Sequence, residues 1–268
     1  MELKGAAALA VALTAAAGPS FAAVTVSSQN CLHLSASVKG ANKRAEIKKQ
    51  NANYAVNLLQ EVMKTADLTQ VTPGLPGTYL VQASPLKGQS SYKEKYAVIY
   101  SNTQAISGAL VDYPLTAKFA RPPSGVLLND GTGSYIWFID FHAVFGKTVK
   151  MRRDEATAMA PVYTWFKAVN AGGRTSDRIV MAGDWNLGAT DAGFTSLKAL
   201  STTMKVEPNV KTSLTRAGAP SEPYDHFVYD SSKVNAGTFM LTPFPANKTP
   251  KWYRDNVSDH RGISCVIP

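Results

Sequence analysis

Apolar residues in this chain gather in short runs, and most of these runs have the length and composition of strands. β-Branched or aromatic runs cover residues 24–30, 54–61, 96–100, 135–142, 178–183, 227–229 and 263–267. Short runs of this kind between turn-forming residues favour β-structure. Clusters of Gly, Pro and Ser predict loops at 72–77, 84–91, 121–134 and 217–223.

Two other segments have helical patterns. Residues 41–50 are rich in Lys, Arg, Glu and Ala, which predicts a surface helix. Over residues 154–169, apolar side chains recur at every third or fourth position before Gly172-Gly173, which predicts a helix packed on the core. These apolar positions are Ala156, Met159, Tyr163, Phe166 and Val169. Many strands with few helices indicate an α/β fold with two packed sheets and helices outside.

The N-terminus has the pattern of an export signal. Lys4 precedes an Ala-rich apolar stretch over residues 5–17, and Ser20-Phe21-Ala22 has the small-x-small pattern of a cleavage site. We predict a signal peptide over residues 1–22 and a secreted or periplasmic protein cut near Ala22. The alternative, a short membrane anchor, would need a longer apolar stretch. No other stretch approaches membrane-spanning length, so no stable membrane association is expected.

Composition fits one folded domain over residues 23–268, expected to be a monomer. The chain has 268 residues, of which 45% are hydrophobic and 18% charged, enough to form a sizeable core. Its net charge of +9 favours a polyanionic partner, although the same charge could serve solubility alone. The two cysteines, Cys31 and Cys265, could form a disulfide in an exported protein or remain buried free thiols.

Seven segments place acids, amides or imidazoles at the ends of predicted strands. They are Asn30, Gln60-Glu61, the stretch 92–96, Asp140-Phe141-His142, Gly183-Asp184-Trp185-Asn186, Tyr224-Asp225-His226 and Ser258-Asp259-His260. Loops at strand ends are where functional groups are usually mounted.

Glu61 follows a buried strand, where a lone carboxylate is costly unless it is paired or bound to a metal. A hard cation such as Mg²⁺ takes oxygen ligands, and Glu61, Asp259 and the amide oxygen of Asn30 could supply them. Alternatively, Glu61 points to the surface. Asp184 and Asn186 stand two residues apart, so an extended segment turns both to one face, where Asn186 could donate to a phosphate. The alternative for this pair is a simple Asx turn after a strand.

Hydrolysis of a phosphodiester needs a base for water and an acid for the leaving oxygen, and imidazoles suit both roles. His142 and His260 stand at the ends of apolar strands, and Glu94 and Asp225 are the acids that could orient them. A structural role is the alternative for either histidine alone. Two histidines with an acid for each favour catalysis.

These segments together resemble the deoxyribonuclease I group of the endonuclease/exonuclease/phosphatase superfamily. The resemblance runs from about residue 24 to the C-terminus, in the order Ser28-Gln29-Asn30, Leu59-Gln60-Glu61-Val62, Tyr92-Lys93-Glu94-Lys95-Tyr96, Phe119-Ala120-Arg121-Pro122-Pro123, His142, Gly183-Asp184-Trp185-Asn186, Tyr224-Asp225 and Ser258-Asp259-His260. It implies a four-layer α/β sandwich of two mixed sheets flanked by helices. It also implies cleavage that leaves 5′-phosphate ends.

The resemblance also implies a role for each candidate. Glu61 would be the main Mg²⁺ ligand, helped by Asn30 and Asp259, with Mn²⁺ as a possible substitute. His260 with Asp225 would activate water, and His142 with Glu94 would protonate the leaving 3′ oxygen. The remaining candidates would contact DNA: Asp184, Asn186 and Arg121 at the phosphate, and Tyr92 at the backbone or sugar.

The sequence departs from this group at several positions. Met63 stands where such nucleases carry an Arg that enters the minor groove, which puts duplex preference in question. Pro122 replaces an acidic residue of a calcium site, and the usual vertebrate disulfide cysteines are missing. Structural calcium is therefore left open.

The leading hypothesis is a secreted, Mg²⁺-dependent endodeoxyribonuclease that binds DNA mainly through its phosphates and has little sequence preference. A sphingomyelinase-like phospholipase is an alternative, but the chain lacks an aromatic hairpin cluster for membrane insertion. A toxin-subunit nuclease typically reads L-D-Y where this chain has Tyr224-Asp225. A non-catalytic DNA-binding relic is the last alternative, and the filled catalytic positions argue against it.

Overall fold

The structure is a computed structural model that describes residues 23–35, 40–74, 78–89, 92–102, 110–130 and 133–268. The expected signal peptide, residues 1–22, lies outside the described residues, as do parts of three predicted loops, at 75–77, 90–91 and 131–132. Within the described part, no helix combines the length and apolar character needed to cross a membrane.

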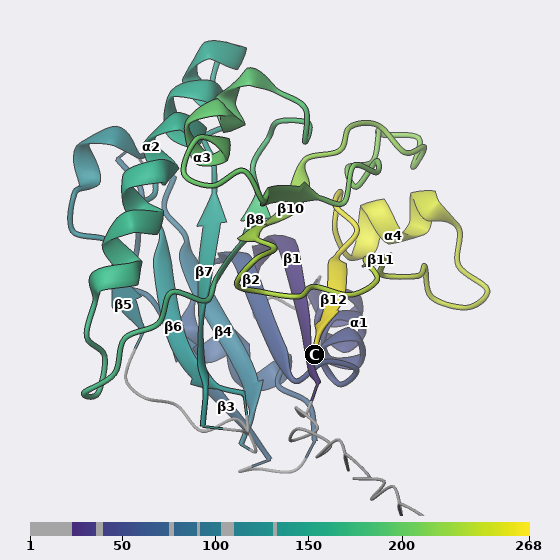
Figure 1. The fold of residues 1–268 in the computed structure, drawn as a ribbon. Coiled ribbons are helices and arrows are strands. Elements are labelled where there is room, and N and C mark those ends of the chain that lie inside the picture. The colour runs from purple at the N-terminus through teal and green to yellow at the C-terminus, as the bar shows by residue number, and fades with distance from the viewer. Residues whose placement is uncertain (1–22, 36–39, 75–77, 90–91, 103–109, 131–132) are drawn as a thin grey trace, which may run out of the picture.

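Two six-stranded sheets form the body of the protein (Figure 1). The first has the order β11-β12-β1-β2-β4-β3 and pairs β1 with β2 in parallel but with β12 antiparallel. The second has the order β5-β6-β7-β8-β10-β9, with β7 and β8 parallel and the other pairs antiparallel. Both sheets are therefore mixed, and the predicted fold class is confirmed.

The strands of the first sheet are β1 (Val24–Leu34), β2 (Val56–Val62), β3 (Tyr79–Ala83), β4 (Lys95–Ser101), β11 (Met240–Leu241) and β12 (Ile263–Ile267). Those of the second are β5 (Val111–Asp112), β6 (Ser124–Asn129), β7 (Tyr135–His142), β8 (Ile179–Asp184), β9 (Met204–Glu207) and β10 (Asp225–Asp230). The helices are α1 (Ala41–Asn51), α2 (Val149–Ala168), α3 (Thr195–Lys198) and α4 (Pro250–Asn256), with short 3-10 turns at Thr65–Gln70, Thr116–Lys118 and Ala192–Phe194.

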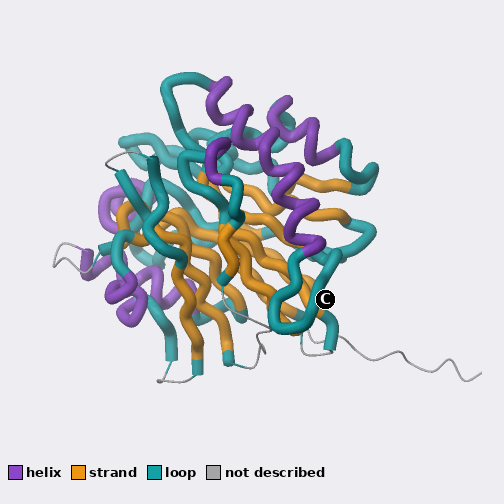
Figure 2. The backbone as a smooth tube through the Cα atoms, turned by 90° about the vertical axis from the view of Figure 1, so that its left-hand side faces the viewer, coloured by secondary structure: helices purple, strands orange, loops and turns teal. Residues whose placement is uncertain are grey.

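The apolar core of the described residues consists of three clusters, and strand β7 contributes to two of them. Its side chains alternate between faces: Trp137 and Phe141 pack in the cluster that contains α2, whereas Ile136 and Phe138 pack in the cluster between the sheets. A strand that is buried on both faces reads as a continuous apolar run, which is how the sequence revealed it. A third cluster joins α1 and α4 to the outer face of the first sheet, so helices cover both sheets (Figure 2).

Strand β6 contradicts the loop predicted over residues 121–134. Gly125 belongs to the Gly, Pro and Ser cluster that predicts this loop, but it sits within the strand, where a Cβ would lie 2.6 Å from the Phe166 ring of α2. The glycine is needed for close packing of helix on sheet, not for a turn. Helix α2 also begins earlier than residue 154, because the Thr148 side chain caps it by accepting from the backbone N–H of Met151. Strands β3, β5, β9 and β11 and helix α4 were not predicted.

The possible disulfide does not form. Strands β1 and β12 are neighbours, but their register pairs Val26 with Cys265 and leaves Cys31 further along β1. Cys31 also packs under the helices, whereas Cys265 packs between the sheets, so the two thiols lie on opposite faces of one sheet. Both are free and buried, which was the other possibility.

Candidate active site

The polar segments predicted from the sequence meet at one edge of the sandwich. The parallel pairs β1/β2 and β7/β8 both end there, and the register brings His142 opposite Asp184. A cavity of about 440 Å³ opens at this edge. It is lined by Asn30, Glu61, His142, Phe145, Asp184, Asn186, Ser213, Leu214, Ser221, Glu222, Tyr224, Asp259 and His260. Seven of these residues were candidates from the sequence.

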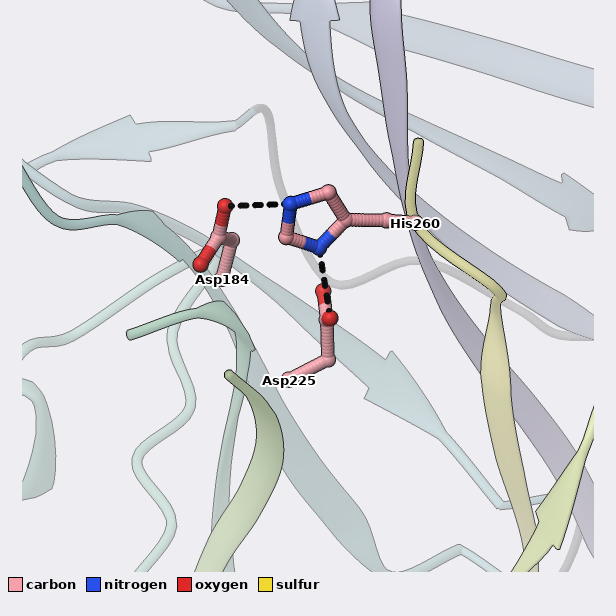
Figure 3. Close-up of side chains that lie close together, drawn as sticks. All are labelled: Asp184, Asp225 and His260. Carbon is pink, nitrogen blue, oxygen red and sulfur yellow. Dashed lines mark hydrogen bonds and ion pairs between the residues drawn. The ribbon is translucent and has the colours of Figure 1, made fainter. Parts of the chain in front are cut away.

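His260 lies between two carboxylates (Figure 3). Its Nδ1 is 2.7 Å from Oδ2 of Asp225, and its Nε2 is 3.5 Å from Oδ2 of Asp184. Burial would lower the pKa of the imidazole, but the two carboxylates outweigh it and raise that pKa to about 10. The free protein therefore holds His260 as an imidazolium at neutral pH.

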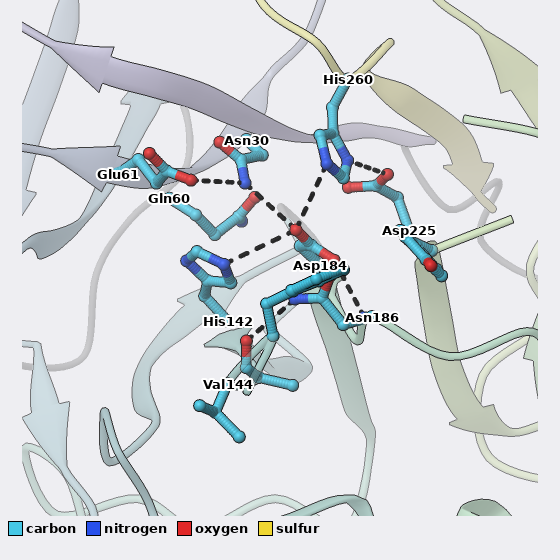
Figure 4. A network of polar contacts seen from close by, with 12 residues as sticks. Asn30, Gln60, Glu61, His142, Val144, Asp184, Asn186, Asp225 and His260 are labelled. Carbon is cyan, nitrogen blue, oxygen red and sulfur yellow. Dashed lines mark hydrogen bonds and ion pairs between the residues drawn. The ribbon is translucent and has the colours of Figure 1, made fainter. Parts of the chain in front are cut away.

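A different acid, Glu94, orients His142 in the same way, and Figure 4 shows the His142 ring approaching Asp184. Its Nδ1 is 2.7 Å from Oε1 of Glu94, and its Nε2 is 3.6 Å from the same Asp184 oxygen that His260 approaches. Burial and Arg121 both lower the pKa of His142, but the Glu94 carboxylate outweighs them and raises it. Two carboxylate-oriented imidazoles thus point their free nitrogens at one oxygen.

Asp184 is the point on which the site converges. Its Oδ2 accepts from the Asn30 amide at 3.1 Å, and its Oδ1 accepts from the Asn186 backbone N–H at 2.9 Å. This second contact is the Asx turn considered as the alternative for this motif, so a structural and a functional role coexist. Gly183 allows β8 to lie close to β7 just before this turn, since a Cβ there would lie 1.7 Å from the Phe141 carbonyl oxygen. Burial raises the pKa of Asp184, and His260 only partly offsets that effect.

Glu61 sits in a backbone conformation that few residues adopt, with φ of 58°. Its carboxylate accepts from Asn30 Nδ2 at 3.0 Å, from Tyr92 OH at 2.8 Å and from the His33 backbone N–H at 3.1 Å. The side chain is therefore buried in the site, not turned to the surface. Burial would raise its pKa, but the charge of His142 and the hydrogen bonds from Asn30 and Tyr92 outweigh it and lower the pKa.

The donor set fits a hard divalent cation. Glu61, Asp184 and Asp259 all line the cavity, and carboxylate oxygens are ligands that Mg²⁺ prefers. Asn30 is arranged differently from the sequence expectation: its Oδ1 accepts from the Leu32 N–H at 2.9 Å, and its amide nitrogen faces the cavity. As a ligand through oxygen, Asn30 would first have to turn its amide.

A second acidic group has the spacing of a metal site. Ligand atoms of Asp184, Asp225 and His260 all lie within 4.8 Å of one another. Both nitrogens of His260 already face carboxylates, and an imidazolium with a proton on each nitrogen satisfies these contacts. A proton accounts for this cluster without a metal, so Glu61 with Asp259 is the better place for a cation.

Arg121 is turned away from the cavity. Its guanidinium donates to the backbone carbonyls of His142 at 3.2 Å and Ala143 at 2.8 Å, and Nη1 lies 3.7 Å from Glu94 Oε2. In this arrangement it holds Glu94 and the end of β7. Tyr92 likewise contacts Glu61 rather than lining the cavity.

Several residues at the site were not assigned a role from the sequence. Gln60 Nε2 donates to Asp140 Oδ1 at 2.6 Å and so joins the two sheets directly beneath the cavity. The signal was present, because an Asp interrupts the apolar run of β7. Phe145 and Arg152 also lie at the site, but no spacing or composition marks them in the sequence.

No protein-family model matches this chain, and neither does any curated protein. Solved structures do match. The D. rerio TDP2 crystallised with a single-strand DNA product aligns with 92% of this chain and 99% of its own, at 17% identity and a TM-score of 0.65. An endonuclease/exonuclease/phosphatase family protein from Bacteroides thetaiotaomicron covers 91% and 97%, at 16% identity and a TM-score of 0.67.

A mannosyl-6-phosphatase from the same bacterium covers 91% and 99%, at 16% identity and a TM-score of 0.65. These neighbours are members of the endonuclease/exonuclease/phosphatase superfamily. At such low identity, the likeness shows that this chain has their fold.

Proposed function

We propose that this protein is a secreted, Mg²⁺-dependent endodeoxyribonuclease that cuts DNA with little sequence preference and leaves 5′-phosphate ends. The observation that carries the proposal is the convergence of two histidine–carboxylate pairs on Asp184, beside the ionised Glu61. Two imidazoles on either side of one point suit an in-line displacement, which needs a base and an acid on opposite sides of the phosphorus.

In the proposed mechanism the scissile phosphate enters between His142 and His260. A Mg²⁺ ion held by Glu61 and Asp259 would supply positive charge to a phosphate oxygen. Asp225 orients His260 so that Nε2 can accept a proton from the attacking water, once the proton that it holds in the free protein has left. Glu94 orients His142 so that Nε2 can give its proton to the departing 3′ oxygen.

The remaining contacts hold these groups in place. Asn30 donates to Glu61 and Asp184, which lie on different sheets, and so fixes the distance between the cation site and the phosphate site. The Asn186 amide donates to the Ala143 carbonyl at 2.9 Å, which fixes the loop after β7. The net charge of +9 supports a polyanionic substrate, because contacts with phosphates supply non-specific affinity.

The test is nicking of supercoiled plasmid by the purified mature protein, with and without EDTA, beside a His142→Ala variant. We expect wild-type nicking only with added Mg²⁺, 5′-phosphate ends that a ligase can reseal, and a variant slower by about 10²- to 10⁴-fold. Undiminished nicking under chelation or by the variant would contradict the mechanism. Hydrolysis of a choline phospholipid with no DNA cleavage would replace the proposed substrate.

A further inference from the structure

One rim of the cavity carries two aromatic side chains and an arginine. Phe145, in the loop between β7 and α2, is 57% exposed although it lines the cavity. Its ring centre is 6.4 Å from that of Tyr224, at an angle of 71°. The Arg152 guanidinium, from α2, lies 4.0 Å from the centre of the Phe145 ring and 5.9 Å from that of Tyr224.

These three residues, the Phe145 platform, are held in place by polar contacts. Arg152 Nε donates to the Phe145 carbonyl at 2.7 Å, while its Nη1 donates to the Asn186 carbonyl at 3.3 Å and lies 3.5 Å from Tyr224 OH. One arginine thus joins the loop that carries Phe145 to the Asp184–Asn186 turn. The Tyr224 ring also lies nearly parallel to the His260 imidazole, at 29° and 6.4 Å. The platform therefore stands directly beside the reacting groups.

We infer that the Phe145 platform binds an unpaired nucleobase next to the scissile phosphate, by stacking. This inference rests on the proposed nuclease function. Aromatic rings and guanidinium planes stack on any base, because every base has a π-face. Phe145 has no polar side-chain atom with which to read a base edge, so the contact tolerates any sequence.

The platform sets a preference for the form of the DNA. A base inside a duplex is covered on both faces by its neighbours, and it must leave the stack before it can contact Phe145. Unstacking costs a few kcal/mol, least where the base is already unpaired. Single strands, frayed ends and mismatches are therefore better substrates than the interior of a duplex.

A choline headgroup is the other ligand that aromatic side chains commonly bind. Arg152 already places a cation 4.0 Å from the Phe145 ring centre, which is the position that a quaternary ammonium would take. A quaternary ammonium elsewhere on the Phe145 ring would be repelled by this guanidinium, whereas the same guanidinium attracts a phosphate. The charge of the platform thus favours a nucleotide over a choline lipid.

The test is a double-mutant cycle between Phe145 and the base. Single-stranded oligonucleotides of one sequence are prepared with a single abasic site placed at each position around a single cleavable phosphodiester, the other linkages being phosphorothioates. Cleavage by wild type, Phe145→Ala and Phe145→Trp is followed with Mg²⁺ at fixed salt. Leu200→Ala, which truncates a side chain that is 42% exposed and does not line the cavity, is the matched control.

We expect Phe145→Ala to lower kcat/KM on the intact strand by roughly ten-fold or more, as for loss of one base–aromatic contact. On a strand that is abasic at one position beside the cut, the two proteins should differ far less, because the contact is already gone. Phe145→Trp should retain the wild-type rate, Leu200→Ala should change nothing, and wild type should cut single strands several-fold faster than the matched duplex.

An equal loss on intact and abasic strands at every position would overturn the platform, and so would an unchanged rate for Phe145→Ala. In both cases DNA is still cut, so the proposed nuclease function stands. Failure of the wild-type protein to cut any DNA would overturn both. In that event, choline-phospholipid hydrolysis that depends on Phe145 would identify the other ligand of the rim.

Discussion

The two histidine–carboxylate pairs of the site are alike in geometry but differ in what stands behind each acid. Each pair crosses the sandwich: His260 precedes β12 of the first sheet and contacts Asp225 of β10 in the second, while His142 ends β7 of the second and contacts Glu94, next to β4 of the first. Any shift of one sheet on the other would break both pairs at once. The site is therefore as rigid as the packing between the sheets.

The two pairs differ in the other groups that contact each carboxylate. Glu94 has Arg121 at 3.7 Å, and its Oε1 also lies 3.4 Å from the Glu61 backbone nitrogen, which donates to it. Asp225 has no such cation among the described residues, and His260 is left between two carboxylates. This explains why the pKa of His260 rises to about 10 while Arg121 restrains the rise at His142. Glu94 therefore belongs to a network that includes a cation, whereas Asp225 contacts His260 without a second cation from the described residues to support it; we call these the network at Glu94 and the isolated contact at Asp225.

The largest effects should come from removing either imidazole. We expect His142→Ala and His260→Ala each to lower kcat by about 10²- to 10⁴-fold, because each loses an acid–base group. The double variant should be little worse than the slower single variant, since the two groups act on one transition state. Multiplicative losses in the double variant, measured by plasmid nicking, would mean that the pairs act independently.

Replacing each acid by its neutral amide should reveal a difference in stability between the two pairs. We expect Glu94→Gln and Asp225→Asn each to lower kcat by about 10²-fold, because each imidazole loses the partner that orients it. Glu94→Gln should lower the free energy of unfolding more than Asp225→Asn does, by about 3 kcal/mol, because it leaves the buried Arg121 without its carboxylate. His260 can lose its proton when Asp225 is gone, whereas Arg121 stays charged.

Urea unfolding of the two acid variants beside wild type measures this difference. Equal losses of stability would show that Arg121 does not support Glu94. The isolated contact at Asp225 would then be no different from the network at Glu94.

Substitution of Arg121 can distinguish two roles for this residue. If Arg121 supports Glu94, its replacement by Met should lower kcat by about ten-fold and leave the salt dependence of DNA binding unchanged. A phosphate-contacting Arg121, as the family resemblance implied, would instead reduce the slope of log affinity against log salt by about one unit. Binding of a labelled oligonucleotide over a range of salt concentrations separates these outcomes, with Arg121→Lys as the conservative control.

The sequence predicts the features that depend on a local pattern of residues. It does not predict features that depend on contacts between distant segments. Strands buried on both faces, such as β7, read as continuous apolar runs, and the polar residues at their ends mark the cavity. Gly125 suggests a loop in the sequence because the contact that requires a glycine, with the Phe166 ring of α2, involves a residue 41 positions away in the chain. The direction of Arg121 and the exposure of Phe145 likewise depend on contacts between segments far apart in the sequence.

A third contact across the sheets, between Gln60 and Asp140, differs from both pairs because it has no imidazole. Asp140 is fully buried, and burial raises its pKa from 3.8 to about 8, although the Gln60 amide partly offsets this. Its Oδ2 and the Gln60 Oε1 are both buried without a hydrogen-bond partner. A proton on Asp140 Oδ2 would give this oxygen a hydrogen to donate, with the Gln60 oxygen as an available acceptor. The neutral acid is thus the form that suits this contact.

The smallest effect should come from Asp140→Asn, and it should be a change in stability that depends on pH. Because the folded protein keeps Asp140 protonated more strongly than the unfolded chain does, wild type loses stability as pH rises from 3.8 towards about 8, and the loss levels off above that. An uncharged Asn carries no such linkage. The stability of Asp140→Asn relative to wild type, from urea unfolding at several pH values, should therefore increase between pH 5 and pH 8, with kcat changed less than in Glu94→Gln. A difference that stays constant with pH would mean that Asp140 is ionised in the folded protein, and the contact beneath the cavity would then be a charged one like the two above it.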